Sequence, residues 1–384
     1  MTFGTLLVIV LAGLGGPLLG LGGKRFVPVV IGEILAGIVV GKTGLGIVDP
    51  TNVTVAFLGQ IGFAMLMLTV GMHLPLRDSR LAGALRGGAV LAAIVAVLAP
   101  LAGLAAAAVA GTSSHVAVYA VVLASGSAAV LLPALEEAKT EGRDALTVMA
   151  WVTIADVVTI LSVPIALQPS RLGHAALGGA LVAVAGLALF GLARLLAGHE
   201  WVNRVRHLSK QRHWALDLRL SLLALFLLAW IAQKSGTSVL IAGFGAGVMV
   251  ALVGGPKRLS TQMRGVADGF FIPLYFVVLG AQLDLQGLFS EPAMLALVGM
   301  LVALNVLLRV VASLLTRRPL YTALAASAQL GVPAAAASIG LAEGVLSSTV
   351  ATAIVAAAVI SLGVCTLGVD LLIRREEQVA SATA

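Results

Sequence analysis

Charge is what this sequence has least of. Only 11% of its 384 residues are charged, whereas 60% are hydrophobic and the mean hydropathy is +1.08. Soluble globular domains carry about 25% charged residues. The composition therefore excludes an ordinary soluble protein and places the whole chain in a membrane.

Cysteine and paired histidines are also scarce. The single cysteine, Cys365, excludes internal disulfides and argues against a cysteine-ligated metal site. The six histidines show no paired spacing of the kind that metal ligands have. These absences remove several enzyme classes, and we expect neither an enzyme nor a bound cofactor.

Long apolar runs are what the sequence does have. Together with turn residues and charges they predict about 13 transmembrane helices, which makes the fold an all-α polytopic membrane protein. The helices are expected to begin near residues 3, 26, 54, 87, 116, 145, 173, 214, 237, 268, 292, 320 and 347.

The basic residues predict the orientation. With the N-terminus outside, most of the 24 lysines and arginines fall in inner loops, and the outer loops hold only Lys42, Arg171 and Lys234. Because basic loops stay in the cytoplasm, we expect a multi-pass protein of the cell membrane with its N-terminus outside and its C-terminus inside. The net charge of +7 then reflects topology, and no nucleic acid is expected as a partner.

Asp156 is the only acidic residue in the apolar stretch from Ala145 to Gln168. In a helix that rises about 1.5 Å per residue, it lies roughly 18 Å from either end, too deep to reach the lipid headgroups. Intramembrane carboxylates usually face an aqueous cavity on an ion or proton path, and a purely structural hydrogen-bonding role is the alternative. We interpret Asp156 as the transient site of a monovalent cation or a proton.

One predicted helix is interrupted just before the Asp156 helix. Ser125, Gly126 and Ser127 stand in sequence, and Pro133 follows. We expect Gly126 to act as a hinge and the two serines to lie at the ion site, where freed backbone carbonyls would suit Na⁺ or a similar small cation.

A second interruption contains Gln329, Gly331 and Pro333. The two interrupted helices are seven spans apart, so they cross the membrane in opposite directions. Matched interruptions of this kind are typical of inverted-repeat transporters, whose half-helix ends line an ion site. Prolines that merely kink packed helices are the alternative.

Other intramembrane polar residues are weaker candidates. Arg309, with Asn305 one turn away, is interpreted as a fixed counter-charge, although its side chain could instead extend to the membrane surface. Glu33 is surrounded by small residues, which favours helix packing over ion binding. Thr153 and Gln329 are secondary candidates for the ion site.

The sequence resembles the monovalent cation:proton antiporters, the family that includes sodium/proton exchangers and potassium-efflux systems. Three segments carry the resemblance, which covers nearly the whole chain. They are VPVVIGEILAGIVVG from Val27 to Gly41, WVTIADVVTIL around Asp156, and GFFIPLYFVVLGAQLDL from Gly269 to Leu285.

The resemblance implies a homodimer with two inverted-topology repeats, crossed discontinuous helices and a core that moves against a dimerisation domain. Asp156 matches the acid that binds cation and proton alternately, and Arg309 matches a basic position. The sequence departs at Ala155, where members usually have aspartate or asparagine, and this puts the coupling stoichiometry in doubt. The implied division is dimerisation helices at 1–85, core helices at 86–168, a linking helix and cytoplasmic loop at 169–213, dimerisation helices at 214–290, core helices at 291–373 and a cytoplasmic tail at 374–384.

We therefore expect a secondary antiporter that exchanges a monovalent cation for H⁺ by alternating access, most simply in an electroneutral cycle, with Na⁺ as the first choice of cation and K⁺ or Li⁺ as alternatives. Membrane lipid is expected to surround the apolar helices. A cation channel, a K⁺-efflux system and a transport-inactive sensor with the same fold are the alternatives. Asp, Ser and carbonyl oxygens serve all three cations, so the sequence does not choose among them.

Overall fold

The described part of the chain is helical, and no strand occurs in it. The computed structural model describes residues 1–20, 28–72, 79–111, 115–128, 130–131, 135, 140, 142–168, 172–197, 199–212, 214–254 and 257–383. The helices are α1 (Phe3–Gly13), α2 (Gly15–Gly20), α3 (Val29–Val40), α4 (Val53–Met72), α5 (Ser79–Ala110), α6 (Val116–Ala124), α8 (Arg143–Leu167), α9 (Leu172–Ala197), α10 (Glu200–Gln211), α11 (Leu216–Lys234), α12 (Val239–Val253), α13 (Lys257–Val266), the π-helix η3 (Ala267–Phe271), α14 (Ile272–Gln282), α15 (Leu285–Ser290), α16 (Pro292–Leu315), α17 (Leu320–Ala325), α18 (Gly331–Ala342) and α19 (Ser348–Thr383).

Within the described ranges, eight helices are long and apolar enough to cross a membrane. Shorter apolar helices lie at Phe3–Leu19, Val29–Val40, Val239–Val253 and Gly331–Ala342. Most predicted starts agree with helix starts to within about three residues, which confirms an all-α membrane fold. The start near residue 87 is an exception, because α5 begins at Ser79.

The segment 169–213, predicted to hold a linking helix and a cytoplasmic loop, contains a further short helix that was not predicted. Residues Glu200–Gln211 form α10. Trp201, Val205 and Leu208 recur at the helical spacing of four and three residues, which is the local signal for a helix that is apolar on one face. The segment is polar on average, and this concealed the helical period of its apolar residues.

The tenth predicted span is the C-terminal part of a longer helical run from Lys257 to Gln282. The run widens to a π-helix at Ala267–Phe271 and returns to α-helix just before Pro273. Proline has no N–H, and its ring clashes with the carbonyl four residues earlier, so a wider turn before it relieves both problems.

Contacts within the chain define two compact units. Unit 1 contains Met1–Thr51, Arg77–Leu167 and Phe276–Ala384, and unit 2 contains Asn52–Leu76 and Gln168–Tyr275. This division follows contacts inside one chain and does not test which helices meet a second copy. The predicted dimerisation and core domains therefore stay a prediction.

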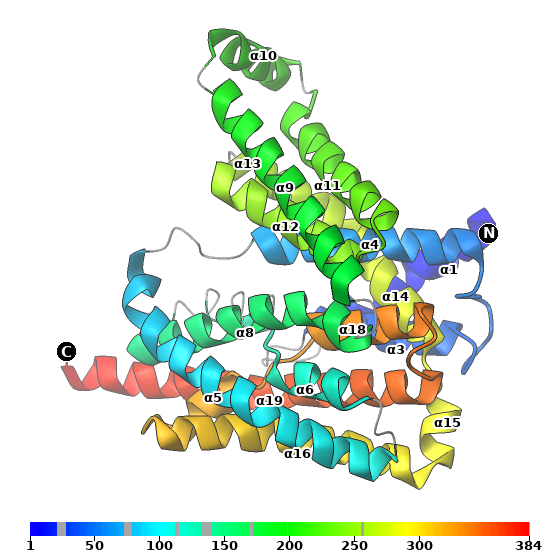
Figure 1. Ribbon diagram of the computed structural model, residues 1–384, viewed down its shortest axis with the longest axis vertical. Helices are drawn as coiled ribbons and strands as arrows, with labels where there is room; N and C mark the ends of the chain where they lie inside the picture. Colours follow the sequence, from blue (N-terminus) through cyan, green and yellow to red (C-terminus); the bar gives the residue numbers. More distant parts are fainter. Residues whose placement is uncertain are drawn as a thin grey trace. The chain divides into compact units, whose positions relative to one another are not determined.

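Unit 1 holds both interrupted helices. In it α5 packs against α6, α8 and α16, while α19 packs against α16, α17 and α18 (Figure 1). Gly88 lets α5 approach α8, because a Cβ at this position would lie 2.6 Å from the Trp151 backbone nitrogen. Gly368 likewise lets α19 approach α17, because a Cβ at this position would lie only 2.2 Å from the Ala325 backbone nitrogen. Small residues of this kind allow membrane helices to pack closely.

Candidate functional site

The first interruption lies where it was predicted. Helix α6 ends at Ala124, and Ser125 has the extended angles φ −70° and ψ 156°. A regular turn resumes after Ser127, whose carbonyl accepts hydrogen bonds from Val130 and Leu131. Gly126 lies against α8, because a Cβ at this position would lie 2.9 Å from the Val152 carbonyl oxygen. Pro133 lies outside the described residues.

Asp156 is placed beside this interruption. Its side chain is 2% exposed, and Oδ2 accepts a hydrogen bond of 3.2 Å from the Ala128 backbone N–H. Oδ1 is buried without a hydrogen-bond partner among the described residues. A buried carboxylate with one free oxygen is costly unless another ligand completes its contacts.

The second interruption separates α17 from α18. Helix α17 ends at Ala325, and Leu330, with φ −147° and ψ −62°, precedes the first residue of α18. Gly331 and Pro333 were expected to lie in the break itself, but they form the first turn of α18. Proline is tolerated there because the N–H groups of the first turn have no partner within the helix.

Arg309 holds the carbonyl ends of both interrupted helices. Its Nε donates to the Ala326 carbonyl at 2.8 Å, its Nη1 donates to the Leu123 carbonyl at 3.2 Å, and its Nη2 donates to the Ser125 carbonyl. The side chain is 2% exposed, so it does not extend to a membrane surface. The C-terminal end of a helix carries partial negative charge, and a guanidinium is a suitable partner for two such ends.

Asn305 and Gln329 complete this network. Asn305 accepts from Arg309 Nη1 through its side-chain oxygen, and its Nδ2 donates to the Ser327 carbonyl and to Ser361 Oγ at 3.0 Å each. Gln329, in the second interruption, donates from Nε2 to the Val122 carbonyl at 2.7 Å. The two interruptions are thus cross-linked by buried side chains from the second half of the chain.

One part of the sequence-based interpretation needs correction. The carbonyls of the first interruption were expected to be free for a cation, but those of Leu123 and Ser125 accept from Arg309, and the Ser125 hydroxyl donates to the Val122 carbonyl at 2.7 Å. The reason is that a broken helix frees carbonyls that a buried guanidinium can satisfy. Arg309 makes no ion pair with any acid in the described part of the chain, and its role as a fixed counter-charge stays a prediction.

Comparison with known proteins agrees with this architecture. The family model described as "Sodium/hydrogen exchanger, transmembrane" matches residues 6–375. The chain belongs to this family. Its members are transporters, and the relatives below are named as antiporters and not as enzymes.

The putative Na⁺/H⁺ antiporter YjbQ of Bacillus subtilis (strain 168) is 24% identical over 293 residues, which are 72% of this chain and 47% of that protein. An Na⁺/H⁺ antiporter of Enterococcus hirae is 24% identical over 287 residues, 73% of each chain. The structure of the sodium proton antiporter MjNhaP1 from Methanocaldococcus jannaschii at pH 8 is similar in fold, with a TM-score of 0.61, 19% identity and coverage of 96% of this chain and 95% of that one. The chain matches only about half the length of the first of these relatives.

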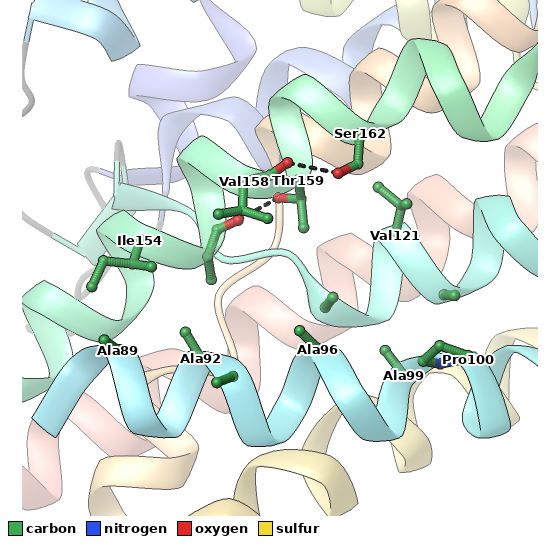
Figure 2. Close-up of a pocket in the computed structure, with 14 residues that line it drawn as sticks. Ala89, Ala92, Ala96, Ala99, Pro100, Val121, Ile154, Val158, Thr159 and Ser162 are labelled. Atoms are coloured by element: carbon green, nitrogen blue, oxygen red, sulfur yellow. Dashed lines mark hydrogen bonds between the residues drawn. The ribbon is translucent and has the colours of Figure 1, made fainter. Parts of the chain in front are cut away.

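An apolar cavity of about 350 Å³ adjoins the Asp156 helix in this exchanger-family core (Figure 2). It lies between α5, α6 and α8, and alanines of α5 line much of it. Ala155, the departure from the family pattern, is among its lining residues. The hydroxyls of Thr159 and Ser162 donate to the carbonyls of Ala155 and Val158, so they contribute little polarity to the cavity (Figure 2). Such a cavity is unsuited to a cation.

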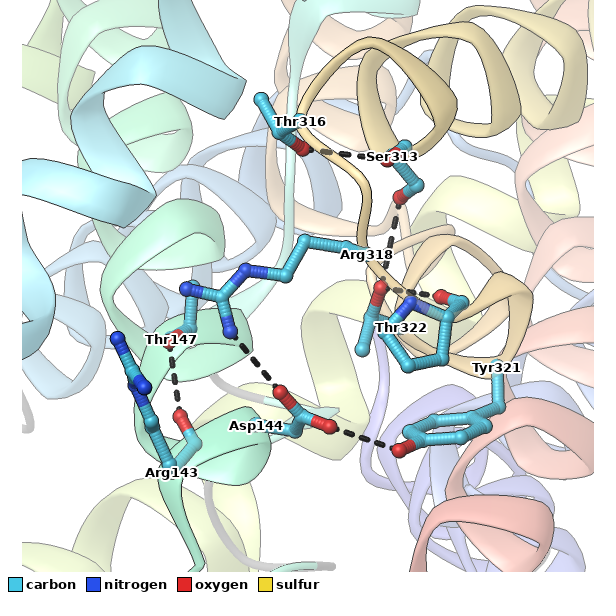
Figure 3. Close-up of polar contacts among 9 residues, drawn as sticks. Arg143, Asp144, Thr147, Ser313, Thr316, Arg318, Tyr321 and Thr322 are labelled. Atoms are coloured by element: carbon cyan, nitrogen blue, oxygen red, sulfur yellow. Dashed lines mark hydrogen bonds and ion pairs between the residues drawn. The ribbon is translucent and has the colours of Figure 1, made fainter.

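A polar cluster at the start of α8 was not predicted. The Asp144 carboxylate accepts a hydrogen bond of 3.0 Å from Arg318 Nη1 and one of 2.7 Å from the Tyr321 hydroxyl (Figure 3). It thereby joins the helix of Asp156 to the connection before α17. An acid in the first turn of a helix is a recognisable sequence signal. Its partners lie 174 and 177 residues away, so no local sequence pattern indicates them.

The remaining candidates lie at different places. Ser127 is 2% exposed in the first interruption. Thr153 is half-buried on α8, one turn before Asp156, and its hydroxyl has no hydrogen-bond partner in the described ranges. Glu33 is buried on α3, and a Cβ at Gly16 of α2 would lie 3.1 Å from its Cγ. Its surroundings are those of a close helix contact.

Proposed function

We propose that this protein is a secondary antiporter in which Asp156 binds a monovalent cation and a proton alternately. The observation that carries the proposal is the environment of this carboxylate. It is buried beside an interrupted helix, Oδ2 is held by one backbone N–H, and Oδ1 has no partner in the described ranges. Either a proton or a cation on Oδ1 would remove the cost of a buried charge.

Competition for one carboxylate produces exchange. If the core changes its accessible side only when Asp156 is neutralised, each crossing carries a proton or a cation, and leak is suppressed. Arg309 does not take part in this titration, because arginine keeps its proton and its guanidinium is engaged with helix ends. Its role is to hold the two interruptions in the geometry that presents Asp156.

The cation is proposed to be Na⁺. The relatives named above are Na⁺/H⁺ antiporters, and a carboxylate oxygen is a hard ligand that suits small cations. Thr153 lies one turn before Asp156, and Ser127 lies in the first interruption. Neither hydroxyl donates to a backbone carbonyl within the described residues, and both are proposed as further ligands. K⁺ and Li⁺ are coordinated by the same oxygen types.

The cycle is proposed to be electroneutral, with one proton exchanged for one cation. Ala155 cannot titrate, so Asp156 is the one group of this site that changes state. The site then carries the same charge with either ligand. We also propose that the protein is a homodimer of the cell membrane and that its N-terminus lies outside.

The test is transport by purified protein in liposomes that contain a pH-sensitive dye and hold an acidic interior. Addition of Na⁺ outside is expected to dissipate the pH difference, and K⁺ and Li⁺ are added in separate runs to rank the cations. Liposomes without protein are the control. If no alkali cation changes the interior pH, although the protein is folded and incorporated, the proposal is wrong and a transport-inactive sensor is favoured. Uncoupled electrical conductance would instead indicate a channel.

A further inference from the structure

Two amphipathic helices of unit 2 differ in how their apolar faces are covered. On α13, Leu259 and Met263 are only 6% and 1% exposed, so the protein itself covers that face. On α10, Val205 and Leu208 are only half-buried, and Trp201 is 54% exposed. Since both helices have the same kind of period, the apolar face of α10 is the one that lacks a complete partner among the described residues.

The position of α10 restricts what can cover it. Helix α9 is a membrane-length helix that ends at Ala197, and α10 begins at Glu200. Three residues span at most about 10 Å, and α11, the next membrane-length helix, begins at Leu216, five residues after α10 ends at Gln211. Helix α10 joins the ends of α9 and α11 and is therefore held at the membrane surface (Figure 1).

The charges of α10 indicate the chemistry of that surface. Residues 200–212 contain four basic residues and one acidic residue. Arg204 and His207 are exposed on α10 itself, and the Arg212 guanidinium lies 5.6 Å from the Trp214 ring, which is 43% exposed. Exposed tryptophan beside arginine is typical of the layer in which apolar rings meet lipid headgroups.

We propose that α10 lies in the plane of the membrane surface and binds anionic lipid headgroups there, with Trp201 inserted among the lipid chains. Arg204 and Arg212 supply the charge that selects phosphate-bearing anionic lipid over zwitterionic lipid. The occupant is lipid and not an acidic protein, because the uncovered face is apolar and begins within three residues of a membrane helix. This inference does not depend on transport.

The test uses the full chain in liposomes, with a nitroxide label at single introduced cysteines. Cys365 is 3% exposed and can be left in place, with the unsubstituted chain as the labelling control. Trp201→Cys places the label on the apolar face of α10, and His207→Cys places it on the polar face of the same helix. Accessibility to oxygen, which enters lipid, is measured against accessibility to a nickel chelate, which stays in water.

In vesicles with phosphatidylglycerol at 30% of the lipid, a several-fold higher oxygen-to-nickel ratio is expected at position 201 than at position 207. The ratio at 201 is expected to fall in vesicles of phosphatidylcholine alone. Arg204→Gln with Arg212→Gln should abolish this lipid difference. The Asp156→Asn variant should behave as the parent does, which separates this result from the fate of the proposed transport.

Three results would overturn the inference. Equal ratios at the two positions would show that α10 does not lie on the membrane. Protection of position 201 from both reagents would show that protein covers it, either a second copy or another partner. The same ratio in both kinds of vesicle would show that α10 does not select anionic lipid.

Discussion

The two interrupted helices of unit 1 belong to helix groups of similar architecture and opposite chemistry. In the first group, α5, α6 and α8, alanines line the first helix and the third helix carries Asp156. In the second group, α16 to α19, the first helix carries Asn305 and Arg309, and the last helix, α19, carries the neutral Ser361. The acid and the base thus come from different positions in the two groups.

This difference assigns different tasks to the two groups. The second group supplies donors to the carbonyl ends of both interruptions, through Arg309, Asn305 and Gln329. The first group supplies a carboxylate that keeps one oxygen without a partner in the described ranges. In the proposed mechanism, structural charge and exchangeable charge are therefore separated, which is what a site needs if one ion must leave while the fold stays intact.

Removing the exchangeable charge should have the largest effect. Asp156→Asn keeps the size of the side chain but removes the group that titrates, so exchange should fall to the level of empty liposomes. The protein should still purify in a folded state, since the Ala128 N–H can donate to an amide oxygen. Exchange like that of the wild type in this variant would contradict the single-carboxylate mechanism.

Removing the structural charge should damage the fold itself. Arg309→Ala removes the side-chain donor of the Ser125 and Ala326 carbonyls and leaves the Leu123 carbonyl with only a 3.5 Å bond from Gln329, and each buried unpaired group costs about 1–3 kcal/mol. A large loss of thermal stability in detergent is expected, together with loss of transport.

Arg309→Lys is the matched variant. It keeps the charge but offers a point donor in place of a planar fork, so partial recovery of stability is expected. If the alanine variant is as stable as the wild type, Arg309 does not hold the interrupted helices.

The contact between α5 and α8 tests how tightly the first group is packed. Gly88→Ala would force a Cβ to 2.6 Å from the Trp151 nitrogen, and such overpacking costs about 1–3 kcal/mol. Gly83→Ala, on the same helix with nothing within 4 Å, is the control and should be neutral or slightly stabilising. Equal melting temperatures for the two variants would argue against the close approach.

The ion pair of Asp144 with Arg318, which links the two helix groups, should contribute less to the free energy of unfolding. Asp144→Asn removes the charge that pairs with Arg318, but both side chains are partly exposed, at 25% and 21%, so the loss should stay below about 1 kcal/mol. Thermal unfolding in low and high salt measures it. A loss of several kcal/mol would show that the cluster is a main support of the core.

Membrane potential should have the smallest effect, which is none. One net charge per cycle would couple about 2.3 kcal/mol per 100 mV, whereas an electroneutral cycle couples nothing. Proteoliposomes clamped with a K⁺ gradient and valinomycin, with Na⁺ as the transported ion, measure proton flux at each potential. A clear dependence would indicate a second titrating group, and Glu33 would be the first residue to substitute.

Local patterns made much of the fold predictable. Apolar runs, charge punctuation and glycine-rich or proline-rich interruptions act over a few residues, so helix starts and the break after Ala124 could be predicted from sequence. The position of Gly331 and Pro333 inside the first turn of α18 was not predicted, because glycine and proline are compatible with both a break and a helix start. The helix at Glu200–Gln211 was missed because its polar composition outweighed its period.

The sequence by itself determined that this is a helical membrane protein with one isolated acid in a span and two oppositely directed interrupted helices. Only the tertiary structure decided which donors satisfy the interruptions, since Arg309 reaches the Leu123 carbonyl across 186 residues of chain. It also decided that Gly126 lies against Val152 and that one oxygen of Asp156 stays without a partner among the described residues. The physical reason is that hydropathy and helix period are properties of neighbouring residues, whereas the pairing of buried polar groups depends on which distant helices meet.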